Sequence, residues 1–176
     1  PYTKAPGRLV WIFSLCVVRD AKGNERLLAH YTVRKDLMTE YEHGVAVYND
    51  ERDIFEAVTT LPLSETWRIP NGHPIEWNDG GVKWLLMGSP TPGVRVPATY
   101  EAVIDPKQYE AFSCADGMKD GKPTGPKLDD SGRPLWRWSK DLPPIDSPTE
   151  AKWVKEGKIR PEDARLCPED VERVEK

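Results

Sequence analysis

The stretch Leu9-Val-Trp-Ile-Phe-Ser-Leu-Cys-Val-Val18 decides the fold class of this chain. It is rich in β-branched and aromatic residues, which favour strands, and it is shorter than a typical helix. The segment Arg19-Asp-Ala-Lys-Gly-Asn24 follows it, and then comes a second apolar run, Glu25-Arg-Leu-Leu-Ala-His-Tyr-Thr-Val33. Two such runs around an Asp/Gly/Asn cluster predict a β-hairpin.

The same alternation of apolar runs and turn residues continues through the first two thirds of the chain. A second hairpin is predicted where Asn78-Asp-Gly-Gly81 separates two apolar runs. The segment 54–58 fits either a strand or a helical turn, and we expect the turn. The predicted strands are 44–48, 74–77, 82–87, 98–104 and 109–114, with a proline-containing loop at 88–97. We therefore expect an all-β fold of antiparallel four-stranded meanders.

One short helix is expected near the C-terminus. Ser147 is a suitable N-cap, Pro148 suits the first helical position, and Glu150 would complete a capping box. Gly157 would end this helix as the residue after its C-cap. The 17 prolines exclude a bundle of long helices, because proline interrupts helix interiors.

The composition divides the chain into three parts. Residues 1–114 are expected to form two blade-like meander units. Residues 115–134 are rich in Gly, Pro, Lys and Asp and are predicted to be an exposed loop or a linker between units. Residues 135–176 would hold a partial third unit with the capped helix and a charged tail.

The phrase His43-Gly-Val-Ala-Val-Tyr-Asn-Asp-Glu-Arg-Asp-Ile-Phe-Glu-Ala-Val58 resembles the final strands of blades in five-bladed propeller glycosidases. Their recurring form is G-(I/V)-A-x-S-x-D-G-x-x-(W/F)-x-x-V, and here Tyr48-Asn49-Asp50 replaces the usual Ser and Asp-Gly. The resemblance to this arabinanase-like and anhydrogalactosidase-like family continues at Gly72-His-Pro74 and at Gly80-Gly81. Each meander also occupies roughly 40 to 50 residues, as propeller blades do.

The resemblance implies a glycoside hydrolase-like propeller segment that acts on a plant or algal polysaccharide or oligosaccharide. Five blades close such a propeller, so we expect the remaining blades to lie in the same longer chain. A non-catalytic carbohydrate-binding segment, or a structural or interaction segment of a larger protein, is the alternative function. A small β-sandwich or open barrel is the alternative fold.

Glycoside hydrolysis needs two carboxyl groups beside the scissile bond. The acids near predicted turns and strand ends are Glu40, Glu42, Asp50, Asp79 and Glu101. The cluster Glu40-Tyr-Glu-His-Gly44 places an imidazole among carboxylates, and some propeller glycosidases use a histidine as the acid. We therefore expect Glu42 and His43 to be the catalytic pair, with a structural histidine as the alternative.

Four further residues are expected to bind substrate. His73 follows Gly72 at the predicted inner end of a blade. Arg95 would clamp a carboxylate or sulfate, or else pair with Glu101 to hold its loop. Trp136 and Trp138 share one strand face, which suits either sugar stacking or a contact between blades.

Several classes of function are not expected. The net charge is −4, with 25 basic and 29 acidic residues interspersed, which argues against nucleic-acid binding. No apolar run approaches the length of a membrane span. Cys16, Cys114 and Cys167 form no C-x-x-C motif, so neither a metal site nor a disulfide framework is predicted. No phosphate-binding or dinucleotide motif is present, and no cofactor is expected.

Overall fold

The computed structural model describes residues 9–68, 72–88, 93–120 and 122–166. The chain forms two compact units, Pro1–Tyr109 and Glu110–Lys176, and each is described by itself. Strands make up most of the regular structure, one antiparallel four-stranded meander is complete, and a short helix lies near the C-terminus. The structure thus confirms the predicted all-β class.

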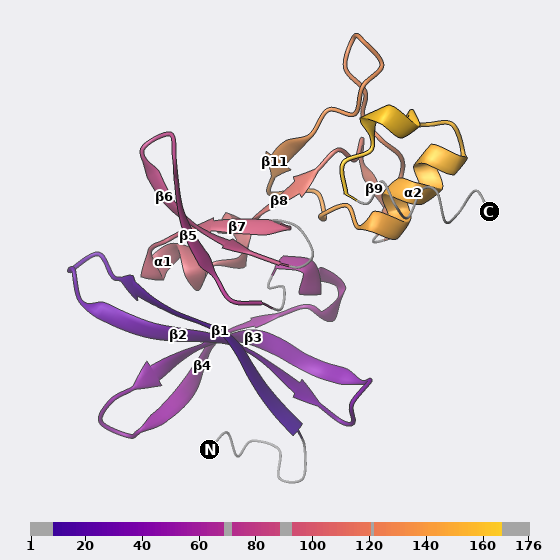
Figure 1. The fold of residues 1–176 in the computed structure, drawn as a ribbon. Coiled ribbons are helices and arrows are strands. Elements are labelled where there is room, and N and C mark those ends of the chain that lie inside the picture. The colour runs from indigo at the N-terminus through magenta and orange to yellow at the C-terminus, as the bar shows by residue number, and fades with distance from the viewer. Residues whose placement is uncertain (1–8, 69–71, 89–92, 121, 167–176) are drawn as a thin grey trace. The chain divides into compact units, whose positions relative to one another are not determined.

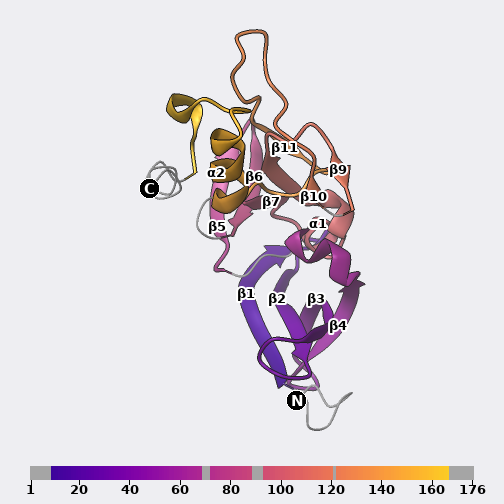
Figure 2. The same ribbon diagram turned by 90° about the vertical axis from the view of Figure 1, so that its right-hand side faces the viewer.

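Four long antiparallel strands form the first sheet of unit one, in the order β1-β2-β3-β4 (Figures 1 and 2). Their bounds are β1 Leu9–Arg19, β2 Glu25–Arg34, β3 Glu40–Asn49 and β4 Ile54–Leu61, and the 3-10 helix η1, Leu63–Arg68, follows. The predicted hairpin of β1 and β2 is confirmed. The helical turn expected at 54–58 is wrong, because this segment pairs with β3 from its first residue onward.

Two of the three register shifts in this sheet decide which side chains of β1, β2 and β3 share a face. Ser14 has a φ of +52°, and its hydroxyl donates a hydrogen bond to the carbonyl oxygen of Gly72. The register between β1 and β2 shifts here, so Phe13 and Cys16 lie on one face although they are three residues apart. A second shift between Val33 and Arg34 leaves Tyr41 as an extra residue on β3.

The two faces of the β1–β4 sheet have different chemistry. Tyr31, Val33 and Ala46 form a buried apolar cluster, which we call the Tyr31 face; four partly buried residues pack on it: Val10, Tyr41, Phe55 and Ala57. The opposite face, the His43 face, also buries the apolar residues Leu28 and Val45, but it carries three buried polar side chains in addition: His30, Thr32 and His43, all at most 3% exposed. Strand alternation explains the split, since successive side chains point to opposite faces.

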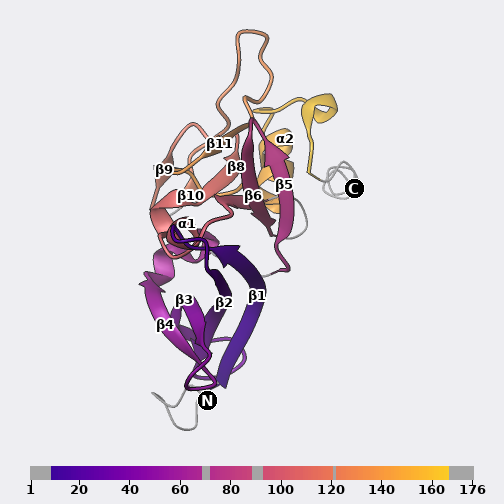
Figure 3. The same cartoon turned by 90° about the vertical axis from the view of Figure 1, so that its left-hand side faces the viewer.

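Three further strands of unit one pair antiparallel in chain order: β5 Ile75–Asp79, β6 Val82–Met87 and β7 Val94–Pro97 (Figure 2; β5 and β6 also in Figure 3). The predicted hairpin at Asn78–Gly81 is confirmed. The loop expected at 88–97 is wrong in its last part, because β7 pairs with β6 from Val94 onward. Residues 89–92 of that loop lie outside the described residues.

The strand expected at 98–104 is also wrong, because this segment holds the one-turn helix α1, Tyr100–Val103. The side chain of Thr99 accepts a hydrogen bond from the backbone N–H of Ala102 and so caps the helix. The 3-10 helix η2, Pro106–Gln108, follows it. Local capping therefore overrides the β-type composition of this segment.

Unit two contains short strands and the C-terminal helix. Their bounds are β8 Glu110–Ser113, β9 Met118–Lys119, β10 Lys122–Pro123, β11 Arg137–Ser139, α2 Ser147–Lys155 and the 3-10 helix η3 Pro161–Asp163. The antiparallel pairs are β8 with β11 and β9 with β10. A separate core of this unit consists of Cys114, Ala115, Leu142, Ile145, Trp153, Val154 and Ile159.

Helix α2 begins differently from the prediction. Asp146, not Ser147, is the N-cap, and its side chain accepts a hydrogen bond from the N–H of Thr149 at 2.9 Å. Glu150 is 1% exposed and accepts hydrogen bonds from the backbone N–H groups of Arg165 and Leu166 at 2.9 and 2.8 Å. It therefore holds the segment after η3 instead of closing a capping box. Gly157 follows the helix with a φ of +69°, as expected.

Gly44 on β3 gives a test of the packing on the Tyr31 face of the first sheet. A Cβ atom at this position would lie 2.0 Å from the backbone oxygen of Thr59 and 3.1 Å from the Tyr31 ring. We expect Gly44→Ala to lower the free energy of unfolding by about 1 to 3 kcal/mol, the usual cost of overpacking. Chemical denaturation measures this. Gly125→Ala is the control, because its Cβ would meet nothing within 4 Å, and equal stability of the two variants would contradict the prediction.

Candidate functional site

Polar side chains occupy positions of the first sheet where a core would usually be apolar. His30 and Thr32 are each 1% exposed, and Thr32 lies directly opposite His43 in the register of β2 and β3. Burying polar groups costs free energy unless they are hydrogen-bonded. The His43 face is therefore the first candidate for a functional role.

The bulge at Tyr41 decides which carboxylate meets His43. Oε2 of Glu40 lies 3.7 Å from Nδ1 of His43, and Oε1 of Glu40 lies 3.3 Å from the guanidinium of Arg34. Glu42 belongs to the Tyr31 face, where it accepts a hydrogen bond from the Tyr31 hydroxyl at 2.8 Å. The structure thus brings Glu40, rather than the expected Glu42, together with His43.

Trp11 marks the exposed border of this cluster. Its ring is stacked by the guanidinium of Arg34, 4.3 Å from the ring centroid. Trp11 is 40% exposed, whereas the Arg34 side chain is 14% exposed and that of His43 only 4%. Solvent exposure therefore decreases along the cluster, from the Trp11 ring through Arg34 to the buried imidazole of His43.

The tautomer of the His30 imidazole follows from its hydrogen bond to Tyr109. The hydroxyl of Tyr109 donates to the carbonyl oxygen of Val103 at 2.8 Å, so it accepts from Nε2 of His30 at 3.0 Å. His30 is therefore protonated on Nε2. Burial lowers the pKa of His30 to about 3, with a smaller contribution from the nearby His43. Burial also raises the pKa of Tyr109 well above its usual value, so both groups are neutral near pH 7.

A second cluster lies on the β5–β7 sheet, on the side we call the Trp77 face. The guanidinium of Arg95 lies 3.9 Å from the centroid of the Trp84 ring and 3.2 Å from Oδ2 of Asp79. Glu101, the partner expected for Arg95, instead accepts a hydrogen bond from the N–H of Ala21 at 2.8 Å. The register places Trp77 directly opposite Trp84, and Arg95 opposite Leu86 on the same face.

The Trp77 face is open to solvent. Ile75, Trp77 and Val82 are 67%, 38% and 42% exposed. On the other side, β6 and β7 bury the apolar residues Leu85, Met87, Val94 and Val96, whereas Glu76 of β5 and Lys83 are exposed. A sheet with one apolar buried face usually has a polar second face. The exposed tryptophan and aliphatic side chains therefore distinguish this surface from an ordinary solvated one.

A group of three side chains recurs in both clusters and once more in the 3-10 helix η1. In each case an arginine side chain, 11 to 14% exposed, stacks on a tryptophan ring at 3.9 to 4.4 Å and pairs with a carboxylate at 2.9 to 3.3 Å. The three sets are Trp11–Arg34–Glu40, Trp67–Arg68–Glu65 and Trp84–Arg95–Asp79. Sequence reasoning missed these sets, and only the strand register of the two hairpins could have indicated the first and third.

The other predicted site residues lie elsewhere. His73 is exposed in the segment just before β5. Trp136 and Trp138 belong to unit two, where both rings lie 5.1 Å from the Phe112 ring, stacked at 17° and tilted at 52°. They thus form one aromatic cluster. Trp136 also borders a cleft of about 470 Å³ in that unit.

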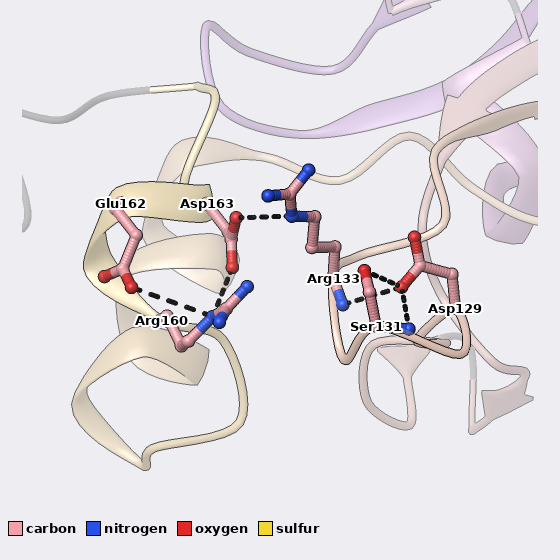
Figure 4. A network of polar contacts seen from close by, with 6 residues as sticks. All are labelled: Asp129, Ser131, Arg133, Arg160, Glu162 and Asp163. Atoms are coloured by element: carbon pink, nitrogen blue, oxygen red, sulfur yellow. Dashed lines mark hydrogen bonds and ion pairs between the residues drawn. The ribbon is translucent and has the colours of Figure 1, made fainter.

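Several residues that line this cleft belong to a network of ion pairs and hydrogen bonds, which Figure 4 shows. Asp163 bridges two arginines, with Oδ1 3.7 Å from Nε of Arg133 and Oδ2 2.6 Å from Nε of Arg160. Asp129 accepts hydrogen bonds from the N–H groups of Ser131 and Arg133 and so holds the turn that carries Arg133. The charged groups of the network are largely engaged with one another.

Among the described residues, no three His, Cys, Asp or Glu side chains are grouped so that they would hold a metal ion. In the same part of the chain, no helix has the length and apolar character to cross a membrane. Fold and clusters together define an all-β protein of antiparallel meanders with stacked Trp–Arg–carboxylate sets. Comparison with protein-family models, curated proteins and solved structures finds no match to this chain.

The buried His30 predicts a pH dependence of stability. Its pKa is about 3 in the folded protein and about 6.5 when unfolded, so between these values only the unfolded chain takes up the proton. We expect this group to lower the free energy of unfolding by about 1.4 kcal/mol per pH unit as the pH falls below 6.5. Denaturant unfolding from pH 7 to 4 measures this. His30→Gln removes the group, so an equally steep decline in that variant would contradict the prediction.

Proposed function

We propose that this chain binds carbohydrate through the Trp77 face of unit one. The observation that carries the proposal is the exposed Trp77 ring beside the Arg95–Asp79 pair. An aromatic plane contacts the apolar C–H face of a sugar ring, and a few fixed polar groups then orient the bound molecule. This face supplies both kinds of contact.

The backbone register supports a fixed geometry for such a site. Trp77 and Trp84 are a direct cross-strand pair, and Arg95 stacks on Trp84 from the neighbouring strand. Three paired strands thus hold the site, so little side-chain freedom is lost on binding. Asp79, whose side chain is 51% exposed, is then available to accept hydrogen bonds from sugar hydroxyl groups.

Glycoside hydrolysis is the second candidate function, favoured by the 3.7 Å contact between Glu40 and His43. A carboxylate beside an imidazole can hold it in the orientation that general acid catalysis requires. The resemblance of residues 43–58 to propeller glycosidases supports this candidate, and the second carboxyl group would come from another blade of a longer chain. We place it second because the His43 side chain is only 4% exposed.

The binding proposal predicts the effect of Trp77→Ala. We expect about a tenfold loss of affinity for a bound polysaccharide, or about 1.4 kcal/mol, because the variant loses the apolar contact between the indole ring and the sugar. Affinity electrophoresis against plant and algal polysaccharides, followed by calorimetry, measures this. Val82→Ala is the matched control, since it removes exposed apolar area from the same face without an aromatic ring. Unchanged affinity of Trp77→Ala would reject this site.

The hydrolysis candidate predicts a difference between two neighbouring glutamates. We expect Glu40→Gln to lower the rate of reducing-end release by at least about 100-fold, within the usual contribution of general acid–base catalysis. Glu42→Gln is the control, because its side chain faces Tyr31. Circular dichroism checks that both variants fold. A larger loss in Glu42→Gln would instead support the pair expected from the sequence.

A further inference from the structure

We propose that the carbohydrate bound at the Trp77 face is uncharged, and that Asp79 is the residue that rejects acidic sugars. This inference rests on the proposed binding function and names its ligand class. A lone arginine beside a tryptophan would favour a carboxylate or a sulfate ester. The surroundings of Arg95 instead favour an uncharged ligand.

The guanidinium of Arg95 is already engaged. It lies against the Trp84 ring at 3.9 Å and pairs with Asp79 at 3.2 Å, and the Arg95 side chain is 11% exposed. The side chain of Asp79 is 51% exposed. A ligand that approaches from solvent therefore meets the carboxylate of this pair before the guanidinium.

The other residues of β5, β6 and β7 supply no compensating positive charge. Lys83 is the only other cation on β5–β7, and strand alternation places it on the opposite side from Trp77. Its ammonium group also pairs with Glu76 at 2.7 Å, and Glu76 lies on that same opposite side. An acidic sugar at Trp77 would thus face a carboxylate without a free cation from these strands.

An uncharged sugar avoids this repulsion and uses the same carboxylate. Ionised Asp accepts hydrogen bonds through both oxygens, and sugar hydroxyl groups are donors. Asp79 therefore attracts one ligand class and repels another, as specific sites commonly do. Arg95 has a positioning role, because it holds the carboxylate in place and keeps Trp84 covered.

The test compares ligand preference in four proteins: the wild type, Asp79→Asn, Glu76→Gln and Trp77→Ala. The neutral probes are arabinan and galactomannan, and the acidic probes are polygalacturonate and alginate, each titrated calorimetrically at two salt concentrations. We expect the wild type to bind a neutral probe at least tenfold tighter than either acidic probe. In Asp79→Asn this ratio falls at least tenfold, chiefly through tighter binding of the acidic probe.

Glu76→Gln is the matched control, because it removes an exposed carboxylate from the opposite side of the same strand, and its preference stays that of the wild type. A wild type that prefers acidic probes, or an unchanged ratio in Asp79→Asn, overturns the specificity inference while Trp77-dependent binding still stands. Binding that is equal in the wild type and Trp77→Ala, or absent for every probe, overturns the proposed function and this inference with it.

Discussion

The hydrogen-bond register between neighbouring antiparallel strands is the constraint on which the rest of unit one depends. A shift of one residue moves a side chain to the other face of a sheet. The single extra residue Tyr41 on β3 does this for the carboxylates near His43. Glu40 turns toward the imidazole and Arg34, while Glu42 joins the Tyr31 face. The β5–β6 register in turn sets Trp77 opposite Trp84.

The stacked Trp–Arg–carboxylate sets show how this scaffold keeps arginines largely buried. A guanidinium is planar and weakly hydrated, so it can lie on an indole ring while its edge binds a carboxylate. Arg34 and Arg95 meet their partners across strands, and Arg68 meets Trp67 and Glu65 within one short 3-10 segment. The pairing removes net charge from each set. What differs among them is the exposure of the carboxylate, whose side chain is 26% exposed in Glu40, 43% in Glu65 and 51% in Asp79.

The fold class followed from the sequence because runs rich in β-branched and aromatic residues, and the turn residues between them, are local signals. The β1–β2 hairpin and the turn at 78–81 were predictable for this reason. The prediction of a strand at 98–104 was wrong because the helix cap formed by Thr99 outweighed the β-type composition of this segment. The prediction of a helical turn at 54–58 was wrong because the pairing of this segment with β3 is set by the partner strand and not by its own residues. Single side chains such as His43 could be picked out, but their neighbours depended on bulges, which no local pattern revealed.

The His43 face carries a cost that an apolar face would avoid. Within the described residues, Nδ1 of His30 and Oγ1 of Thr32 are buried and have no hydrogen-bond partner. Each such group costs roughly 1 to 3 kcal/mol relative to a satisfied one. Valine or leucine at these positions would remove that cost, so the polar choice opposes stability. Local rules are broken in this way mainly where a protein has a function to perform. The Trp77 face breaks a different rule, since its apolar groups are exposed. The two faces are therefore the parts of unit one where the choice of side chains departs from what folding alone favours.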